Sequence, residues 1–156
     1  MKAKVDWKGK LSFTGTADTG FELPLGAKPE VGGDNDGFRP MELMVLSLAG
    51  CTAMDVISIM TKKRQEVKEF EVKVEAERTD EHPKVLTSAV IEYHAAGDQI
   101  VEEALVRSIE LSAERYCPAQ AMLGELIPLE LKYVIYQGES LEDGEAVAAG
   151  SYSTST

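Results

Sequence analysis

Basic side chains are scarce in this chain of 156 residues: 16 lysines and arginines stand against 27 aspartates and glutamates, and the formal net charge is −11. Four of the acidic residues and none of the basic ones lie in residues 138–156, so most of the negative charge belongs to residues 1–137. Nucleic acids and anionic membranes are bound through basic surfaces. The composition therefore argues against both as partners.

Long apolar runs are also missing. The longest uncharged stretch covers residues 43–54, twelve residues closed off by Glu42 and Asp55, whereas a membrane-spanning helix needs about 20. A buried helix is expected there instead. The first five residues contain no apolar core of a secretion signal. We therefore expect a cytoplasmic protein whose thiols are reduced or redox-active.

Recognisable metal and cofactor motifs are absent from the sequence. The two cysteines are 66 residues apart, and the two histidines, His82 and His94, form no HxxxH spacing, so zinc is not expected. The pair Gly32-Gly33 does not make a phosphate-binding loop, and no G-x-S-x-G nucleophile motif occurs. The sequence predicts neither a cofactor nor a metal.

The apolar pattern predicts strands grouped in runs, with few helices between them. Alternation and glycine-containing turns favour hairpins before residue 26, and a loop rich in glycine follows. Pro40 suits the first position of a helix, and Asp98 is a possible N-cap of a second. The expected elements are strands 5–7, 11–16 and 21–25, a helix from 40 to about 60, strands 70–77 and 85–94, a helix after 98, a short helix 118–126 and a strand 128–136.

Strands in runs, without strict strand–helix alternation, indicate an α+β fold. We expect one domain over residues 1–137 and a flexible, acidic, Ser/Thr-rich tail over residues 138–156. The helix over residues 41–60 is apolar on too many sides for a surface helix. It is therefore expected to be central and to pack against its counterpart in a homodimer.

Both cysteines stand in contexts that suit sulfur chemistry, because a thiol reacts as its thiolate and its surroundings set its pKa. Cys117 precedes Pro118, so it is expected to cap a short helix whose free N–H groups and dipole would lower its pKa. A small buried residue that ends a helix is an equally good interpretation. Cys51 lies in mid-helix, where burial raises the pKa of a thiol. Asp55, about 40° away on the same helix face, would oppose a thiolate.

A reactive Cys51 therefore needs a cation from elsewhere. Arg39, at the start of the same helix, is the first candidate, although a solvated loop charge is the more common role for such an arginine. Glu42 lies about 180° from Cys51 on an ideal helix, so it would act across a dimer or from an irregular first turn. Its structural alternative is a carboxylate at a helix start. Other candidate cations are Lys8, Lys10, Arg107 and Arg115.

Two segments together resemble the OsmC/Ohr family of hydroperoxide-resistance proteins. The first runs Pro-Met-Glu-Leu from Pro40 and ends in Ala-Gly-Cys at Cys51; the second, Cys-Pro-Ala-Gln-Ala-Met-Leu from Cys117, is similar to the family motif CPxSxxL. The segment Trp-Lys-Gly-Lys-Leu-Ser-Phe from Trp7 also resembles the family. The likeness spans residues 1–137, and Arg-Pro-Met-Glu-Leu from Arg39 is similar to its YhfA-like subgroup.

The resemblance implies an OsmC-like α+β fold: antiparallel sheets around a central buried helix, in an intertwined homodimer with active sites at the subunit interface. It also implies a thiol-dependent peroxidase for organic hydroperoxides. Cys51 would become a sulfenic acid, Cys117 would condense with it to a disulfide, and an external dithiol would restore both. Met41 stands where the family places its catalytic glutamate, so Glu42 and Arg39 are the expected substitutes for the catalytic pair.

Two other functions compete with the peroxidase. One is a non-catalytic member of the same fold that binds an apolar ligand at the dimer interface, which Met41 supports. The other is an acidic interaction module with inert buried cysteines. Peroxidase chemistry requires the two Cα atoms to lie about 4.4–6.8 Å apart for easy bridging, so the position of the thiols is the discriminating feature.

Overall fold

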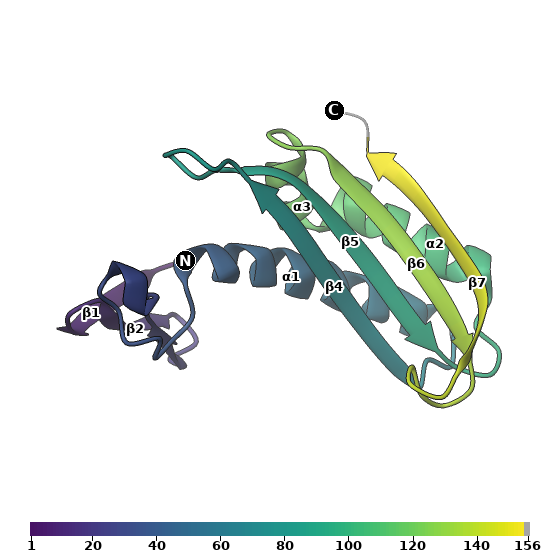
Figure 1. The fold of residues 1–156 in the computed structure, drawn as a ribbon. Helices are drawn as coiled ribbons and strands as arrows, with labels where there is room; N and C mark the ends of the chain where they lie inside the picture. The colour runs from purple at the N-terminus through teal and green to yellow at the C-terminus, as the bar shows by residue number, and fades with distance from the viewer. Residues whose placement is uncertain (155–156) are drawn as a thin grey trace. The chain divides into compact units, whose positions relative to one another are not determined.

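The computed structural model describes residues 1–154, which form two compact units, one over residues 1–44 and one from residue 45 onward. The first unit holds a three-stranded sheet, and the second holds a four-stranded sheet with helices (Figure 1). The α+β class is confirmed. The elements are β1 (Ala3–Gly9), β2 (Ser12–Ala17), β3 (Glu22–Leu25), η1 (Pro29–Val31), α1 (Pro40–Lys62), β4 (Glu69–Arg78), β5 (Leu86–Ala96), α2 (Glu102–Leu111), η2 (Ser112–Tyr116), α3 (Pro118–Gly124), β6 (Leu129–Gln137) and β7 (Glu145–Thr154).

The first unit is the expected run of hairpins. β2 pairs antiparallel with β1 and with β3. The loop that follows β3 is tied to β2 and its turn by polar contacts. Lys10 forms an ion pair with Asp34 at 2.8 Å, and Ser12 donates to Asp36 at 2.5 Å. Gly33 is required in this loop, because a Cβ there would overlap the backbone of Ala27.

α1 begins at Pro40 as expected and continues from the first unit into the second. Its buried positions, Leu48, Thr52, Val56 and Met60, form a single i, i+4 stripe. Met54 on another face is 73% exposed. In a single chain α1 is therefore covered on one side only, not on nearly all sides. Among residues 1–154 it is the one helix long and apolar enough to cross a membrane, a test that core helices also pass, and 22% of its most apolar window is buried.

The second sheet has the order β4-β5-β6-β7. β4 and β5 form the expected antiparallel hairpin, and β6 and β7 are also antiparallel. β5 and β6 are parallel, unlike the antiparallel pairing that we expected. The reason is the connection: a crossover through α2, η2 and α3 returns the chain in the same direction, as parallel neighbours require.

The core of the second unit lies between this sheet and the helices on one of its faces (Figure 1). β5 alternates, so Ala89, Ile91 and Tyr93 face the helices, while Val90, Glu92 and His94 point the other way. The strictly buried part of this core contains Cys117. Its other buried members are Leu48, Val56, Met60, Ala89, Ile91, Tyr93, Ala95, Leu105, Ile109, Ala119, Ile127, Leu129, Leu131 and Ile135.

Two sequence predictions need correction. The prediction of a flexible tail is wrong for residues 145–154, because these residues form β7, which pairs with β6 at the edge of the sheet. Ala148 and Tyr152 of β7 pack against the core. Residues 155–156 lie outside the described part of the chain. Asp98 is also not the N-cap of α2. Val101 holds that position, and its N–H donates to the side-chain oxygen of Gln65 at 2.8 Å.

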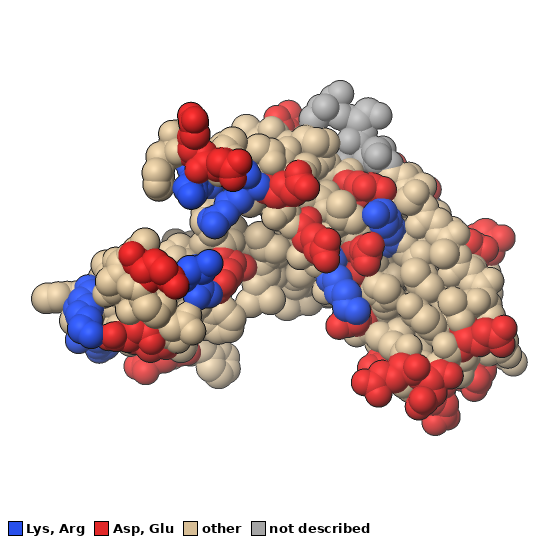
Figure 2. Space-filling view, in the orientation of Figure 1, with Lys and Arg blue, Asp and Glu red and all other residues tan. Residues whose placement is uncertain are grey.

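Acidic side chains outnumber basic ones on the visible surface. Figure 2 shows them on both units, with one group gathered at an end of the second sheet, and basic side chains are fewer. This distribution agrees with the net charge of −11.

Candidate functional site

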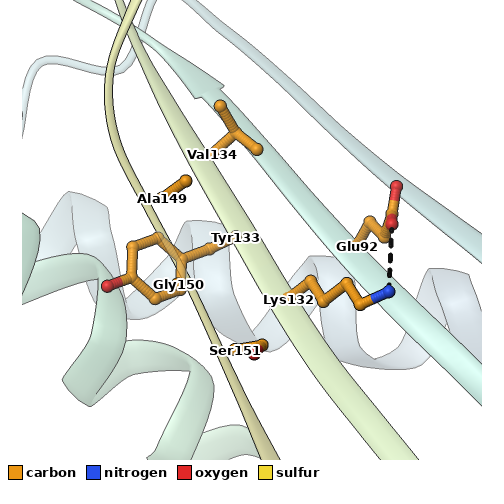
Figure 3. Close-up of a pocket in the computed structure, with 7 residues that line it drawn as sticks. All are labelled: Glu92, Lys132, Tyr133, Val134, Ala149, Gly150 and Ser151. Atoms are coloured by element: carbon orange, nitrogen blue, oxygen red, sulfur yellow. Dashed lines mark ion pairs between the residues drawn. The ribbon is translucent and has the colours of Figure 1, made fainter.

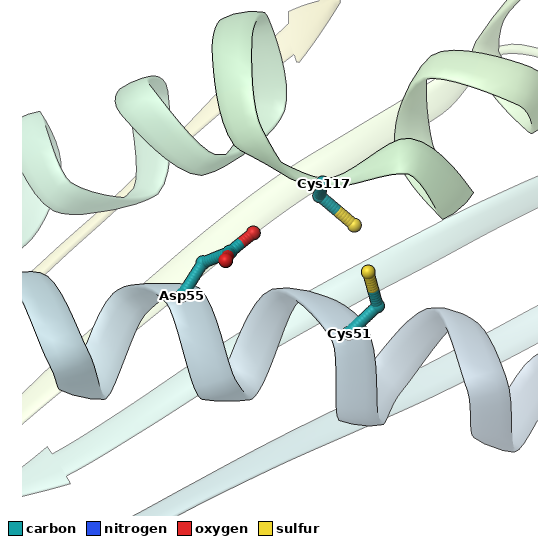
Figure 4. Close-up of side chains that lie close together, drawn as sticks. All are labelled: Cys51, Asp55 and Cys117. Atoms are coloured by element: carbon teal, nitrogen blue, oxygen red, sulfur yellow. The ribbon is translucent and has the colours of Figure 1, made fainter.

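The fold brings Cys51 and Cys117 together. Cys51 lies on α1, and Cys117 lies in the turn between η2 and α3. Their sulfur atoms and a carboxylate oxygen of Asp55 all lie within 4.8 Å of one another. Figure 4 shows the two sulfur atoms pointing toward each other, with Asp55 one helical turn along α1. Both cysteines are free thiols.

A local break in helix geometry positions Cys117. The chain leaves α2 through the π-helical turn η2, and Cys117 then adopts an extended conformation while its N–H donates to the carbonyl of Ser112 at 2.8 Å. Pro118 is the first residue of α3, and Cys117 Sγ accepts from the N–H of Gln120 at 3.4 Å. The predicted helix cap is therefore confirmed.

The effect of this position on Cys117 is opposite to the one expected from the cap. Burial, the largest cause, and a hydrogen bond to Cys51 raise the pKa of the Cys117 thiol to about 12. The N–H groups of Gln120 and Ala119 lower it, but by less. The side chain is 2% exposed, and desolvation outweighs the few donors of a short helix. At neutral pH Cys117 is therefore a protonated thiol.

Cys51 has a different environment from its partner. It is half-buried on α1, beside the fully buried Thr52. Asp55 occupies the same helix face, as the sequence predicted, and is also half-buried. Of the two thiols, Cys51 is the more accessible one. It is therefore the better placed to meet a molecule from solution.

A buried network of hydroxyl groups, which the sequence pattern did not predict, lies next to the thiols. Thr52 Oγ1 is hydrogen-bonded to Tyr93 OH at 2.7 Å and to Ser112 Oγ at 2.9 Å. Ser112 Oγ donates to Asp55 Oδ2 at 3.1 Å. Each hydroxyl has one hydrogen, so Thr52 must donate to Ser112, and Tyr93 to Thr52. The donors therefore run in one direction, from Tyr93 to the carboxylate of Asp55.

Gln120 connects this network to the sulfur site. Its side-chain nitrogen donates to Thr52 Oγ1 at 2.9 Å and to Tyr93 OH at 3.4 Å, while its backbone N–H donates to Cys117. Its side-chain oxygen is buried without a hydrogen-bond partner. The only sequence signal for these residues was a polar side chain on an otherwise apolar face, as for Thr52 on α1. Burial raises the pKa of Tyr93, so its hydroxyl remains a donor.

Arg39 and Glu42 belong to the first unit, whereas the thiols belong to the second. They pair with each other, Nη1 to Oε1 at 2.7 Å, and Glu42 Oε2 also accepts from the N–H of Arg39 at 3.0 Å. This backbone bond, followed by the ion pair, lowers the pKa of Glu42. Glu42 thus stabilises the start of α1, the structural role that we considered for it. Their roles at the thiols remain predictions.

Three of the four other candidate cations, all except Lys8, have partners elsewhere. Lys10 pairs with Asp34, Arg107 with Glu110 at 2.9 Å, and the guanidinium of Arg115 lies 5.8 Å from the ring centre of Tyr116. Within residues 1–154 each of these three cations is thus engaged by a residue other than the two cysteines. A polar neighbour of the Cys51 sulfur in this group is the Cys117 thiol, within 4.8 Å.

A shallow groove lies on the other face of the sheet. It has a volume of about 320 Å³ and contains the ion pair of Lys132 with Glu92 at 3.9 Å (Figure 3). Glu92 and the buried Tyr93 are consecutive on β5, so they point to opposite faces. The groove is therefore separated from the thiols by the sheet. Its lining residues are Glu92, Lys132, Tyr133, Val134, Ala149, Gly150 and Ser151.

The fold and this site define an α+β protein with two neighbouring thiols, one on a long helix and one at the N-cap of a short helix. The family model described as OsmC-like protein matches residues 33–132. The chain is 33% identical to Protein YhfA of Escherichia coli K12 over 138 residues, which are 86% of this chain and 98% of that one. The chain belongs to the OsmC family, and the similarity to YhfA supports the subgroup that the sequence indicated.

Solved structures agree with this assignment. A hypothetical protein from Aquifex aeolicus VF5 is similar with a TM-score of 0.78 and 30% identity, covering 88% of this chain and 97% of its own. A protein from Legionella pneumophila, described as organic hydroperoxide resistance protein OsmC, has a TM-score of 0.64 and 15% identity, covering 86% and 94%. The second likeness concerns the fold alone. An OsmC fold is therefore shown for this chain.

Proposed function

We propose that the protein is a thiol-dependent peroxidase that reduces organic hydroperoxides in defence against oxidative stress. The observation that carries the proposal is the apposition of Cys51 and Cys117, with sulfur atoms within 4.8 Å across 66 positions of sequence. Membership of the OsmC family supports a role in peroxide defence. The two free thiols suit a reducing compartment such as the cytoplasm.

The reaction begins with the Cys51 thiolate attacking the terminal peroxide oxygen. The O–O bond breaks, the alkoxide takes a proton and leaves as an alcohol, and Cys51 becomes a sulfenic acid. The sulfur of Cys117 then attacks the sulfur of Cys51, and the hydroxyl leaves with the Cys117 proton as water. An external dithiol reduces the resulting disulfide by two exchange steps and is itself oxidised to a disulfide.

The environments of the two thiols support different roles for them. Cys51 is half-buried and open to a substrate, whereas Cys117 is 2% exposed and has a pKa raised to about 12. Cys117 is thus a poor nucleophile before oxidation, and its thiol hydrogen would stabilise a thiolate formed at Cys51. Once Cys51 is a sulfenic acid, that negative charge is gone and one cause of the raised pKa is removed. Cys117 then becomes the resolving thiol.

Arg39 and Glu42 are proposed to complete the site. Arg39 would supply the positive charge that favours the Cys51 thiolate, and Glu42 would orient its guanidinium, as it does in their present ion pair. Nε of Arg39 is buried without a hydrogen-bond partner, so the guanidinium retains a donor for a further anion.

A homodimer is part of the proposal. α1 leaves apolar side chains such as Leu46 and Met54 exposed in the single chain, and a second copy of α1 would cover them. An apolar interface beside the thiols would favour organic hydroperoxides over hydrogen peroxide. The partners are thus a second copy of the chain, an organic hydroperoxide and an external dithiol.

The test is single-turnover consumption of cumene hydroperoxide by the reduced protein. We expect one equivalent of peroxide to disappear, with formation of the Cys51–Cys117 disulfide detected by mass spectrometry. Cys51→Ser should show only the background rate. Cys117→Ser should consume peroxide and accumulate a sulfenic acid that dimedone traps. A wild-type rate equal to that of Cys51→Ser would exclude the peroxidase.

A second function is supported by the apolar face of α1 and by Met41 at the family's glutamate position. In this alternative the chain is a non-catalytic OsmC-like protein that binds an apolar ligand at the dimer interface. Saturable binding of an apolar fluorescent probe, together with peroxide consumption no faster than in Cys51→Ser, would favour it.

A further inference from the structure

Cys51, Asp55 and Cys117 form a group of ligand atoms that the proposed peroxidase uses only in part. The two sulfur atoms and one carboxylate oxygen lie within 4.8 Å of one another, and in residues 1–154 they are the one group of three or more potential metal ligands from histidine, cysteine, aspartate and glutamate. The zinc site that we considered from the sequence would have needed His82 and His94. Neither histidine belongs to the group, and Asp55 takes the place of a third ligand.

The geometry suits a small tetrahedral cation. Zn–S distances of about 2.3 Å and Zn–O distances of about 2.0–2.2 Å place the ligand atoms of a tetrahedral site about 3.5–3.8 Å apart. The group lies within 4.8 Å, so rotamer adjustments of about 1 Å or less close it around such an ion. Figure 4 shows the three side chains pointing into one space between α1 and the turn before α3.

The surroundings also suit a metal. Ser112 Oγ donates to Asp55 Oδ2 at 3.1 Å, and the chain of hydroxyls from Tyr93 and Thr52 fixes Ser112. Such second contacts orient a metal-binding carboxylate. Cys51 and Asp55 are half-buried and Cys117 is buried, so one side of the group is open. A water molecule or another ligand can therefore take the fourth position.

We infer that Cys51, Asp55 and Cys117 bind a thiophilic divalent cation of the zinc class when both cysteines are reduced. Two thiolates with one carboxylate favour Zn²⁺ or Cd²⁺ over Mg²⁺ and Ca²⁺, which prefer oxygen ligands. Each coordinating thiol loses its proton to the solvent as the metal–sulfur bond forms. The site needs no peroxide chemistry, so this inference stands independently of the proposed function.

Metal binding would change the reactivity of both thiols. A bound ion engages both sulfur atoms, so Cys51 is not free to attack a peroxide while the ion remains. Conversely, a Cys51–Cys117 disulfide removes two of the three ligands and releases the ion. The metal-bound and disulfide forms therefore exclude each other, and the ion would hold the protein in a reduced resting state.

Cobalt substitution tests the site. Co²⁺ is added under argon to the full-length protein reduced with tris(2-carboxyethyl)phosphine. We expect one equivalent to produce a near-ultraviolet sulfur-to-cobalt charge-transfer band and the intense visible bands of tetrahedral cobalt, and Zn²⁺ to bleach both. Cys51→Ser and Cys117→Ser should each reduce the charge-transfer band, and Asp55→Asn should weaken Co²⁺ binding by at least about 10-fold, the effect of losing even a supporting contact.

Matched controls keep the test decisive. Asp80→Asn, which changes an exposed aspartate in the β4–β5 loop, and His82→Ala should bind Co²⁺ like the wild type. Circular dichroism establishes that each variant is folded, and Ser112→Ala provides a milder test, with binding weakened about 10–100-fold. Wild-type protein without a charge-transfer band, equal binding by the disulfide form, or unchanged affinity in folded Asp55→Asn would each overturn the inference. Peroxide consumption is measured separately, so a chain that consumes peroxide and ignores Co²⁺ loses only the metal site.

Discussion

Gln120 holds Cys117 and Thr52 at the same time: its backbone N–H donates to the sulfur of Cys117 at 3.4 Å, and its side-chain amide donates to Thr52 Oγ1 at 2.9 Å. One residue of α3 thus joins the second thiol to the helix that carries the first. The position of Cys117 relative to α1 depends on this link as well as on the apolar core. Disturbing the polar network should therefore affect both stability and thiol reactivity.

Thr52→Val tests the network with little change in shape. The hydroxyl of Thr52 is hydrogen-bonded to Tyr93, Ser112 and Gln120. Its loss leaves buried polar groups without partners, which lowers stability by about 1–3 kcal/mol. We expect the free energy of unfolding in urea to fall by that amount in the reduced protein. Thr61→Val is the matched control, since its exposed hydroxyl bonds only to the carbonyl of Ile57 one turn back; it should change stability by less than about 0.5 kcal/mol. Equal effects of the two substitutions would contradict the role of the network.

Alkylation should distinguish the two thiols. Cys117 is 2% exposed and its pKa is raised to about 12, whereas Cys51 is half-buried. At neutral pH we expect iodoacetamide to modify Cys51 first, at least about 10-fold faster, because thiolate and access together set the rate. Peptide mass spectrometry over a time course measures both sites. Cys117 should become equally reactive when the protein is unfolded in urea, and faster modification of Cys117 in the folded protein would reverse the proposed roles.

The raised pKa of Cys117 predicts a loss of stability at alkaline pH. Its pKa rises from 9.0 to about 12 on folding, so the folded protein retains a proton that the unfolded chain releases. The resulting stabilisation is complete below pH 9.0 and disappears as the pH rises toward about 12. Between about pH 8 and pH 11 the unfolding free energy of the reduced wild type should fall more steeply than that of Cys117→Ala. Tyr93 and Tyr152, whose pKa values are also raised by burial, occur in both proteins, so the comparison largely removes their effect. Parallel pH profiles would argue against a buried neutral Cys117.

The exposed face of α1 predicts self-association. Met54 is 73% exposed in the single chain, and a large apolar side chain there is expected at the contact between two copies. Light scattering coupled to size exclusion should give twice the chain mass for the wild type and a shift toward monomer for Met54→Lys. Leu126→Lys, at a leucine that is 79% exposed, is the control and should leave the mass unchanged. A monomeric wild type would remove the dimer from the proposal.

The position of the strands and helices was predictable because local pattern carries it. Alternation in residues 70–77 and 85–94 located β4 and β5, and Pro40 located the start of α1. β7 was missed because its Ala, Gly and Glu residues have low strand propensity. Its formation depends on pairing with β6 and on close approach: a Cβ at Gly150 would meet the hydroxyl of Tyr133 at 2.5 Å.

The sequence by itself determined the α+β class, the acidic surface, the cap at Cys117 and the shared helix face of Cys51 and Asp55, since each follows from composition or from nearest neighbours along the chain. Only the tertiary structure decided that the two sulfur atoms meet, that Thr52, Tyr93, Ser112 and Gln120 surround them, and that burial outweighs the cap in setting the pKa of Cys117. Desolvation and long-range contact depend on which elements pack against a group. That packing depends on the whole core, so no single segment of the sequence determines it.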